Sequence, residues 1–211
     1  MIPMFYDLET QRSPREVEIT KLGISCGVVR VNKQNYLYRD SNEDVAALIA
    51  MVSKAELLVS YNGIHFDNNV LRGYQPKLEL TKTVPQYDIL VEIKKIIGTR
   101  VRLDHVLKCN FGDSGTKTAS GLQALAWYAQ IRDYREKAKA HPAKAEQWRI
   151  QEEDVWGKLL EYCTQDTVML AKLLGRIKHG VPIKLEKYWD KSYKMIEIVL
   201  PNPFTEAPWV A

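Results

Sequence analysis

Two acidic residues near the N-terminus have the spacing of a carboxylate pair on one face of a strand. Asp7 and Glu9 are separated by one residue in FYDLET, within a segment (residues 2–10) whose apolar start predicts a strand. Because strand side chains alternate, both carboxylates face the same side of the sheet. Two adjacent negative charges repel each other, and a cation between them relieves the repulsion. Such pairs are common on exposed strands, so a metal role requires further ligands.

A second candidate carboxylate follows the apolar run ELLVSY, residues 56–61, which predicts a buried strand. The next residues include a glycine turn, and Asp67 stands at the start of a helix expected at residues 68–74. Aspartate is a common N-cap, so a capping role and a metal-ligand role both remain open. Asn62 either caps the turn or contacts a substrate.

A third motif, EYCTQDTVML, lies in a helix expected at residues 155–178. Tyr162 and Asp166 are at positions i and i+4, so their side chains lie on one helix face. A carboxylate one turn from a phenol could place both groups beside one metal-bound water. The alternative is a Tyr–Asp pair on the surface.

Taken together, the motifs supply oxygen ligands without His or Cys, a set that selects hard cations such as Mg²⁺ or Mn²⁺. Two such ions about 4 Å apart can activate a water and stabilise the leaving oxygen in phosphodiester hydrolysis. We therefore predict metal ligands at Asp7, Glu9, Asp67 and Asp166, and a catalytic set made of these residues and Tyr162.

The order of these motifs resembles the DEDD superfamily of 3′–5′ exonucleases, which have a ribonuclease H-like fold and include polymerase proofreading domains. FYDLET resembles the first motif, YNGIHFDNNVL the second and EYCTQDTVML the third. Tyr162 resembles the tyrosine of the DEDDy branch, whereas Glu161 stands where the DEDDh branch has histidine. Residues 86–112 and KTASGLQAL further resemble predicted exonuclease domains found with helicases, so the resemblance spans residues 4–180.

The resemblance implies an α/β ribonuclease H-like fold, with a mixed sheet of five or six strands flanked by helices. It implies a two-metal 3′–5′ exonuclease that hydrolyses single-stranded nucleic acid, DNA in preference to RNA, to nucleoside 5′-monophosphates. The substrate is DNA or RNA with a free 3′ end, and a helicase or polymerase is the candidate protein partner. By family analogy the substrate contacts are Leu8, Thr10, Asn62, Phe66 and Lys117.

Two other functions are compatible with parts of the pattern. A ribonuclease H-like or resolvase-like endonuclease would share the acidic strand, but Tyr162 one turn before Asp166 is not expected there. A non-catalytic nucleic-acid-binding module on the same fold usually lacks one carboxylate, and all four are present here.

The remaining pattern predicts a domain over residues 1–180, with strands at 2–10, 18–31 and 35–38, a helix at 42–53 and a helical insert at 129–154. Basic residues come first in the insert and acidic residues last, which favours a solvated helical hairpin over a nucleic-acid-facing arm. Residues 181–211 are expected to form a hairpin and a tail that pack on the domain.

Composition adds limits to the function. The 211-residue chain has a net charge of +4, which permits a polyanionic partner without requiring one. Its three widely spaced cysteines favour neither a zinc site nor a disulfide framework and indicate a reducing compartment. The N-terminus lacks the features of a signal peptide, and no apolar run approaches the roughly 18 residues of a membrane helix. We expect a cytoplasmic protein without membrane contact.

Overall fold

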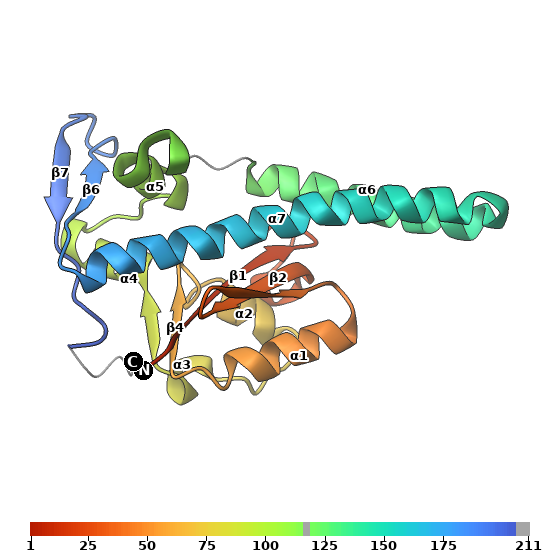
Figure 1. The fold of residues 1–211 in the computed structure, drawn as a ribbon, viewed down its shortest axis with the longest axis horizontal. Coiled ribbons are helices and arrows are strands. Elements are labelled where there is room, and N and C mark those ends of the chain that lie inside the picture. Colours follow the sequence, from red (N-terminus) through yellow and green to blue (C-terminus); the bar gives the residue numbers. More distant parts are fainter. Residues whose placement is uncertain (116–118, 206–211) are drawn as a thin grey trace.

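The computed structural model describes residues 1–115 and 119–205. Its centre is a mixed five-stranded sheet of order β3-β2-β1-β4-β5 (Figure 1). Strand β1 pairs antiparallel with β2 and parallel with β4, and β4 pairs parallel with β5. The predicted α/β class with a mixed sheet is confirmed. The strands are β1 (Pro3–Thr10), β2 (Ile24–Val31), β3 (Gln34–Tyr38), β4 (Leu57–Ser60) and β5 (Gln86–Asp88).

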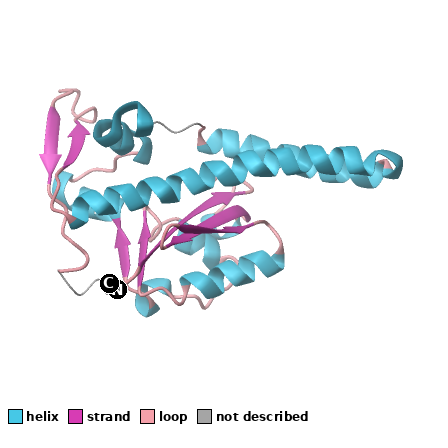
Figure 2. Cartoon of the chain, in the orientation of Figure 1, coloured by secondary structure: helices cyan, strands magenta, loops and turns pink. Residues whose placement is uncertain are grey.

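Helices cover both faces of this sheet (Figure 2). The α-helices are α1 (Asn42–Val52), α2 (Asp67–Arg72), α3 (Leu80–Thr83), α4 (Ile89–Ile97), α5 (Leu103–Phe111), α6 (Gly121–Ala140) and α7 (Ala145–Lys178). Short 3₁₀ turns are η1 (Ile19–Lys21), η2 (Gly112–Gly115) and η3 (Pro142–Lys144). Among the described residues, no helix has both the length and the apolar character that crossing a membrane requires.

Alternation along β1 assigns its side chains to two different cores. Phe5 joins a core with α4, α5 and the C-terminal half of α7. Tyr6 and Leu8 point the other way, into a core with α1 and α2. Asp7 and Glu9 therefore share the face of Phe5 and lie on the side of the sheet that α7 covers.

The strand predicted over residues 18–31 begins later than expected. Residues 19–21 form η1, and β2 starts at Ile24. Gly23 lies between them at φ +71°, a conformation that favours glycine, and its carbonyl accepts the Gln11 backbone N–H at 3.0 Å. In the turn to β3, Asn32 and Lys33 both have positive φ, as a type I′ hairpin turn requires.

A hairpin follows α7, as expected. Strand β6 (Ile183–Glu186) pairs antiparallel with β7 (Met195–Ile198). Ile183, Leu185 and Ile198 are buried in the core formed by α4, α5 and α7. The tail is described only to residue 205, so its last residues lie outside the description.

Helices α6 and α7 pack against each other as a long helical hairpin that projects past the sheet (Figure 1). We call α6 and the N-terminal half of α7 the helical arm. Where the arm meets the sheet, Arg135 binds Asp40 with two hydrogen bonds of 2.6 and 3.0 Å and Glu152 with one of 2.7 Å. Trp156 is fully buried there, beneath the guanidinium groups of Arg39 and Arg135. The arm is thus fixed at its base by charge-assisted contacts.

Replacing Arg135 with glutamine should lower the free energy of unfolding by about 1–2 kcal/mol at pH 7, since Asp40 loses a bidentate partner. Burial raises the pKa of Asp40, but hydrogen bonds from Arg135 and Tyr128 outweigh it and leave the pKa below its ordinary value. A depressed carboxyl pKa stabilises the folded state above the unfolded pKa of about 3.9 and loses that effect as the pH falls further.

Chemical denaturation at pH 7 and pH 3 should therefore show a smaller difference between wild type and Arg135→Gln at pH 3. Lys139→Gln removes an exposed pair with Glu136 on the same helix and should change stability by less than about 0.5 kcal/mol. An equal loss for Arg135→Gln at both pH values would contradict the role of ionised Asp40.

Candidate metal centre

Three carboxylates from two distant elements converge beside the sheet. Asp7 and Glu9 on β1 and Asp166 on α7 each offer an oxygen, and these oxygens all lie within 4.8 Å of one another. Asp166 is buried, and the two strand residues are partly buried. Like charges at this separation destabilise one another unless a proton or a cation intervenes.

One cavity of about 320 Å³ contains this cluster. We call it the carboxylate cavity. All the predicted catalytic residues line it: Asp7, Glu9, Asp67, Tyr162 and Asp166. So do four of the five predicted substrate contacts, namely Leu8, Thr10, Asn62 and Phe66. Lys117 lies outside the described residues.

Asp67 lines the cavity but does not belong to the close group of three. It is the first residue of α2, and the N-cap position is Phe66, so the N-cap alternative for Asp67 is not what the structure has. Burial raises the pKa of Asp67 to about 7, helped by the nearby charges of Asp88 and Asp166 and opposed by backbone N–H groups, including that of Leu8. The burial of Asp67 and the neighbouring carboxylates therefore both disfavour its ionised form.

Tyr162 is nearly fully buried one turn before Asp166 on α7. Its ring packs edge-on against Trp127 of α6, with 6.2 Å between the ring centroids. The same tyrosine also lines a second cavity next to the first. The surface-pair alternative for Tyr162 and Asp166 is therefore excluded by their burial.

Cys163, to which the sequence analysis assigned no role in the site, contacts the cluster. Its thiol lies 3.3 Å from the main-chain oxygen of Asp7 and 3.6 Å from Oδ2 of the same residue. Burial raises the pKa of the Cys163 thiol well above its ordinary value, so the thiol keeps its proton and can donate it to these oxygens. Its position, three residues before Asp166 on the same helix face, was the available signal.

A buried aspartate that the sequence did not single out fixes the loop between β4 and α2. Asp88, at the end of β5, accepts backbone N–H groups of Asn62 at 2.8 Å and Ile64 at 3.1 Å. It also accepts two N–H groups at the start of α4, from Leu90 and Val91. Burial raises the pKa of Asp88 in spite of these four donors. The loop that carries Asn62 is thereby tied to the adjacent parallel strand.

A second buried network holds α2 beneath the cavity. The Tyr6 hydroxyl donates to Oδ1 of Asn68 at 2.6 Å, and the Asn68 amide donates to Oε1 of Gln86 at 2.9 Å. The chain links β1, α2 and β5, so the helix that begins at Asp67 has a fixed position relative to the strand that carries Asp7.

The predicted substrate contacts have different environments. The Leu8 side chain packs in the core on the opposite face of the sheet, and the Thr10 hydroxyl donates to the Arg12 carbonyl at 2.9 Å. Phe66 is partly buried against the same core as Leu8. Asn62 has a φ of +71° and accepts a hydrogen bond from Arg100, so its side chain is held at the cavity wall.

The residues present fit a divalent cation. Three carboxylate oxygens lie close enough to be bridged by one ion, and the donor set contains only the hard oxygen ligands that Mg²⁺ and Mn²⁺ prefer. Asp67 adds a fourth carboxylate to the lining of the same cavity.

An α/β fold with a carboxylate cluster beside its central strand defines a class that includes nucleic-acid-processing enzymes. A family model described as RNase_H superfamily matches residues 4–178, and the chain belongs to that superfamily. Its function is accordingly of the nuclease type.

No curated protein matches the sequence. Among solved structures, the chain is similar to the family B DNA polymerase of the hyperthermophilic archaeon Pyrobaculum calidifontis, with a TM-score of 0.55 and 13% sequence identity. The match covers 84% of this chain and 25% of the polymerase, so the chain spans about a quarter of that protein's length. At this identity the likeness concerns the fold.

Replacing Gly63 with alanine should destabilise the loop that carries Asn62. A Cβ at this position would overlap the Ser60 side chain and lie 2.7 Å from the Tyr6 hydroxyl, so both groups must shift. We expect a loss of about 1–3 kcal/mol in the free energy of unfolding, measured by urea denaturation.

Gly157→Ala is the matched control, because its Cβ meets nothing within 4 Å on α7. That substitution should stabilise the protein by roughly 0.5–1 kcal/mol. If Gly63→Ala were as well tolerated as Gly157→Ala, the close packing under the loop would be disproved.

Proposed function

We propose that the chain is a metal-dependent 3′–5′ exonuclease of the DEDDy type. It hydrolyses single-stranded nucleic acid, DNA in preference to RNA, to nucleoside 5′-monophosphates with two Mg²⁺ or Mn²⁺ ions. The observation that carries the proposal is the convergence of four carboxylates and one buried tyrosine on a single cavity of about 320 Å³. Membership of the RNase_H superfamily supports the nuclease class.

Each residue has a defined task in this proposal. Asp7, Glu9, Asp67 and Asp166 would hold the ions. When bound, the ions lower the pKa of a water and offset the charge that develops on the phosphate. Cys163 fixes the Asp7 carboxylate through its thiol, and Asn62 and Phe66 border the space for the terminal nucleotide.

Tyr162 orients the attacking water and helps to remove its proton. The phenol hydroxyl can both donate and accept a hydrogen bond, which suits it to orient a water. The edge-on contact with Trp127 supports this role, because it packs the ring against α6 at the wall of the cavity.

Two alternatives receive less support. An endonuclease of the ribonuclease H or resolvase kind would not need a tyrosine in this cavity, and Tyr162 is buried there. A non-catalytic binding module would not need to keep four carboxylates together.

Asp7→Asn or Asp166→Asn should remove nearly all Mg²⁺-dependent digestion of a single-stranded oligonucleotide, because each change takes a charged oxygen from the cluster. The same variants should lose the rise in melting temperature that Mn²⁺ gives the wild type, where ligand at 100 times Kd adds about 2.7 kcal/mol. Asp133→Asn, an exposed carboxylate on the helical arm, is the control. Undiminished digestion by both cluster variants would reject the assignment.

Tyr162→Phe should slow hydrolysis by roughly 10- to 100-fold, since only the hydroxyl is lost. The Mn²⁺-dependent rise in melting temperature should remain that of the wild type. If this variant lost metal binding as well, Tyr162 would have a structural role in place of the proposed one.

The polarity of digestion can be read from a time course on 5′-labelled DNA and RNA of equal sequence, single- and double-stranded, with Mg²⁺ and with Mn²⁺. A ladder that shortens from the 3′ end is expected, with DNA degraded faster than RNA. Cleavage of circular single-stranded DNA would instead favour the endonuclease.

A further inference from the structure

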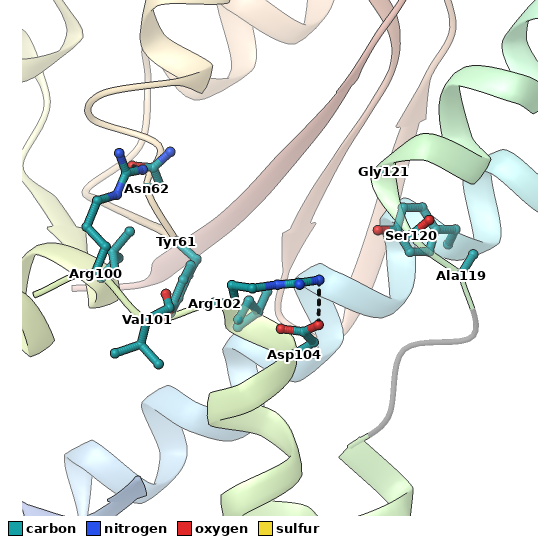
Figure 3. Close-up of a pocket in the computed structure, with 12 residues that line it drawn as sticks. Tyr61, Asn62, Arg100, Val101, Arg102, Asp104, Ala119, Ser120 and Gly121 are labelled. Carbon is teal, nitrogen blue, oxygen red and sulfur yellow. Dashed lines mark hydrogen bonds and ion pairs between the residues drawn. The ribbon is translucent and has the colours of Figure 1, made fainter. Parts of the chain in front are cut away.

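A second cavity of about 370 Å³ adjoins the carboxylate cavity. The two share Tyr61, Asn62, Leu103, Gly121 and Tyr162 along their common wall. The second cavity differs in charge, because its lining contains Arg100 and Arg102 and one carboxylate, Asp104. Arg102 forms an ion pair with Asp104 at 2.9 Å (Figure 3).

A third cavity of about 320 Å³ continues from the second along α4. Asn62, Leu90 and Arg100 line both the second and the third cavity. The lining of the third cavity also contains Lys94, Lys95 and His65. We call the second and third cavities together the basic groove. Its cations are Lys94, Lys95, Arg100 and Arg102, all on α4 or on the segment that leads from α4 to α5.

The segment between α4 and α5 is fastened to the wall of the carboxylate cavity. The Tyr61 hydroxyl donates to the Val101 carbonyl at 2.7 Å, and Arg100 Nη2 donates to Oδ1 of Asn62 at 2.7 Å. Figure 3 shows the Arg100 and Asn62 side chains next to each other at one side of the cavity. A guanidinium is thus held against Asn62, which lines both the groove and the carboxylate cavity.

Two of the four cations have internal partners. Lys95 pairs with Glu92 at 2.7 Å and Arg102 with Asp104. In the part of the chain that the structure describes, Lys94 and Arg100 form no ion pair with a carboxylate. Both are exposed, so their charge is available to an anion from solution.

We infer that the basic groove binds the phosphodiester backbone on the 5′ side of the bond to be cleaved. This inference rests on the proposed function, which puts the terminal nucleotide in the carboxylate cavity. A strand that leaves this cavity past Asn62 enters the groove, where Arg100 and Lys94 meet successive phosphates. Contacts to phosphate position a strand without reading its sequence, so the groove serves any base sequence.

The test is binding of a 5′-fluorescein-labelled 12-nucleotide single strand, followed by anisotropy in EDTA so that hydrolysis is absent. The double variant Arg100→Gln/Lys94→Gln should bind roughly tenfold more weakly at 100 mM salt. The slope of log Kd against log salt should fall by about 0.7 for each lost contact, so by about 1.4 for the pair. The loss should be equal for strands of different sequence.

The control Lys54→Gln/Lys77→Gln removes the same charge from exposed positions near α1 and α3. It should change Kd by less than twofold. Equal weakening by the two double variants, or an unchanged salt slope in the groove variant, would overturn the inference. Should Arg100→Gln fail to fold, Lys94→Gln alone on the exposed face of α4 should still lower the slope by about 0.7.

The outcome is separable from that of the proposed function. Digestion by Asp166→Asn tests the carboxylates, whereas binding in EDTA tests the groove without them. If digestion depends on Asp166 but the groove and control variants bind equally well, the exonuclease proposal stands and the inference about the groove is rejected. If the groove variant binds more weakly than the control variant but the wild type digests no nucleic acid, the groove is a nucleic-acid site and the exonuclease proposal is rejected.

Discussion

Mutual repulsion among closely spaced carboxylates is the constraint that the rest of this structure accommodates. Asp7, Glu9 and Asp166 lie within 4.8 Å of one another, and burial holds the pKa of Asp67 at about 7. No fold gains stability from such an arrangement by itself. Its persistence requires rigid supports and, on our proposal, a cation that replaces the missing positive charge.

The sheet topology supplies the supports. Strands β1, β4 and β5 are parallel, so their carboxyl ends meet at one edge of the sheet. This edge therefore brings together three parts that are far apart in the chain. They are the carboxylates of β1, the loop after β4 and the buried Asp88 at the end of β5. Helix α7 covers the face of the sheet on which Asp7 and Glu9 lie, and it adds Asp166 and Tyr162.

Local periodicity was enough to predict part of the site. Alternation along a strand put Asp7 and Glu9 on one face, and the helical repeat paired Tyr162 with Asp166. The start of β2 was missed because η1 and a positive-φ glycine replace the expected extended chain. The contacts of Cys163, Asp88 and Arg100 could not be predicted in this way, since each depends on packing between segments that no local pattern relates.

Helix α7 is one uninterrupted element of 34 residues, about 50 Å long. Its N-terminal half belongs to the projecting arm, and its C-terminal half carries the tyrosine and the last acidic ligand. Because the helix is continuous, the register in which its N-terminal half packs against α6 also sets the rotation at which Tyr162 and Asp166 face β1.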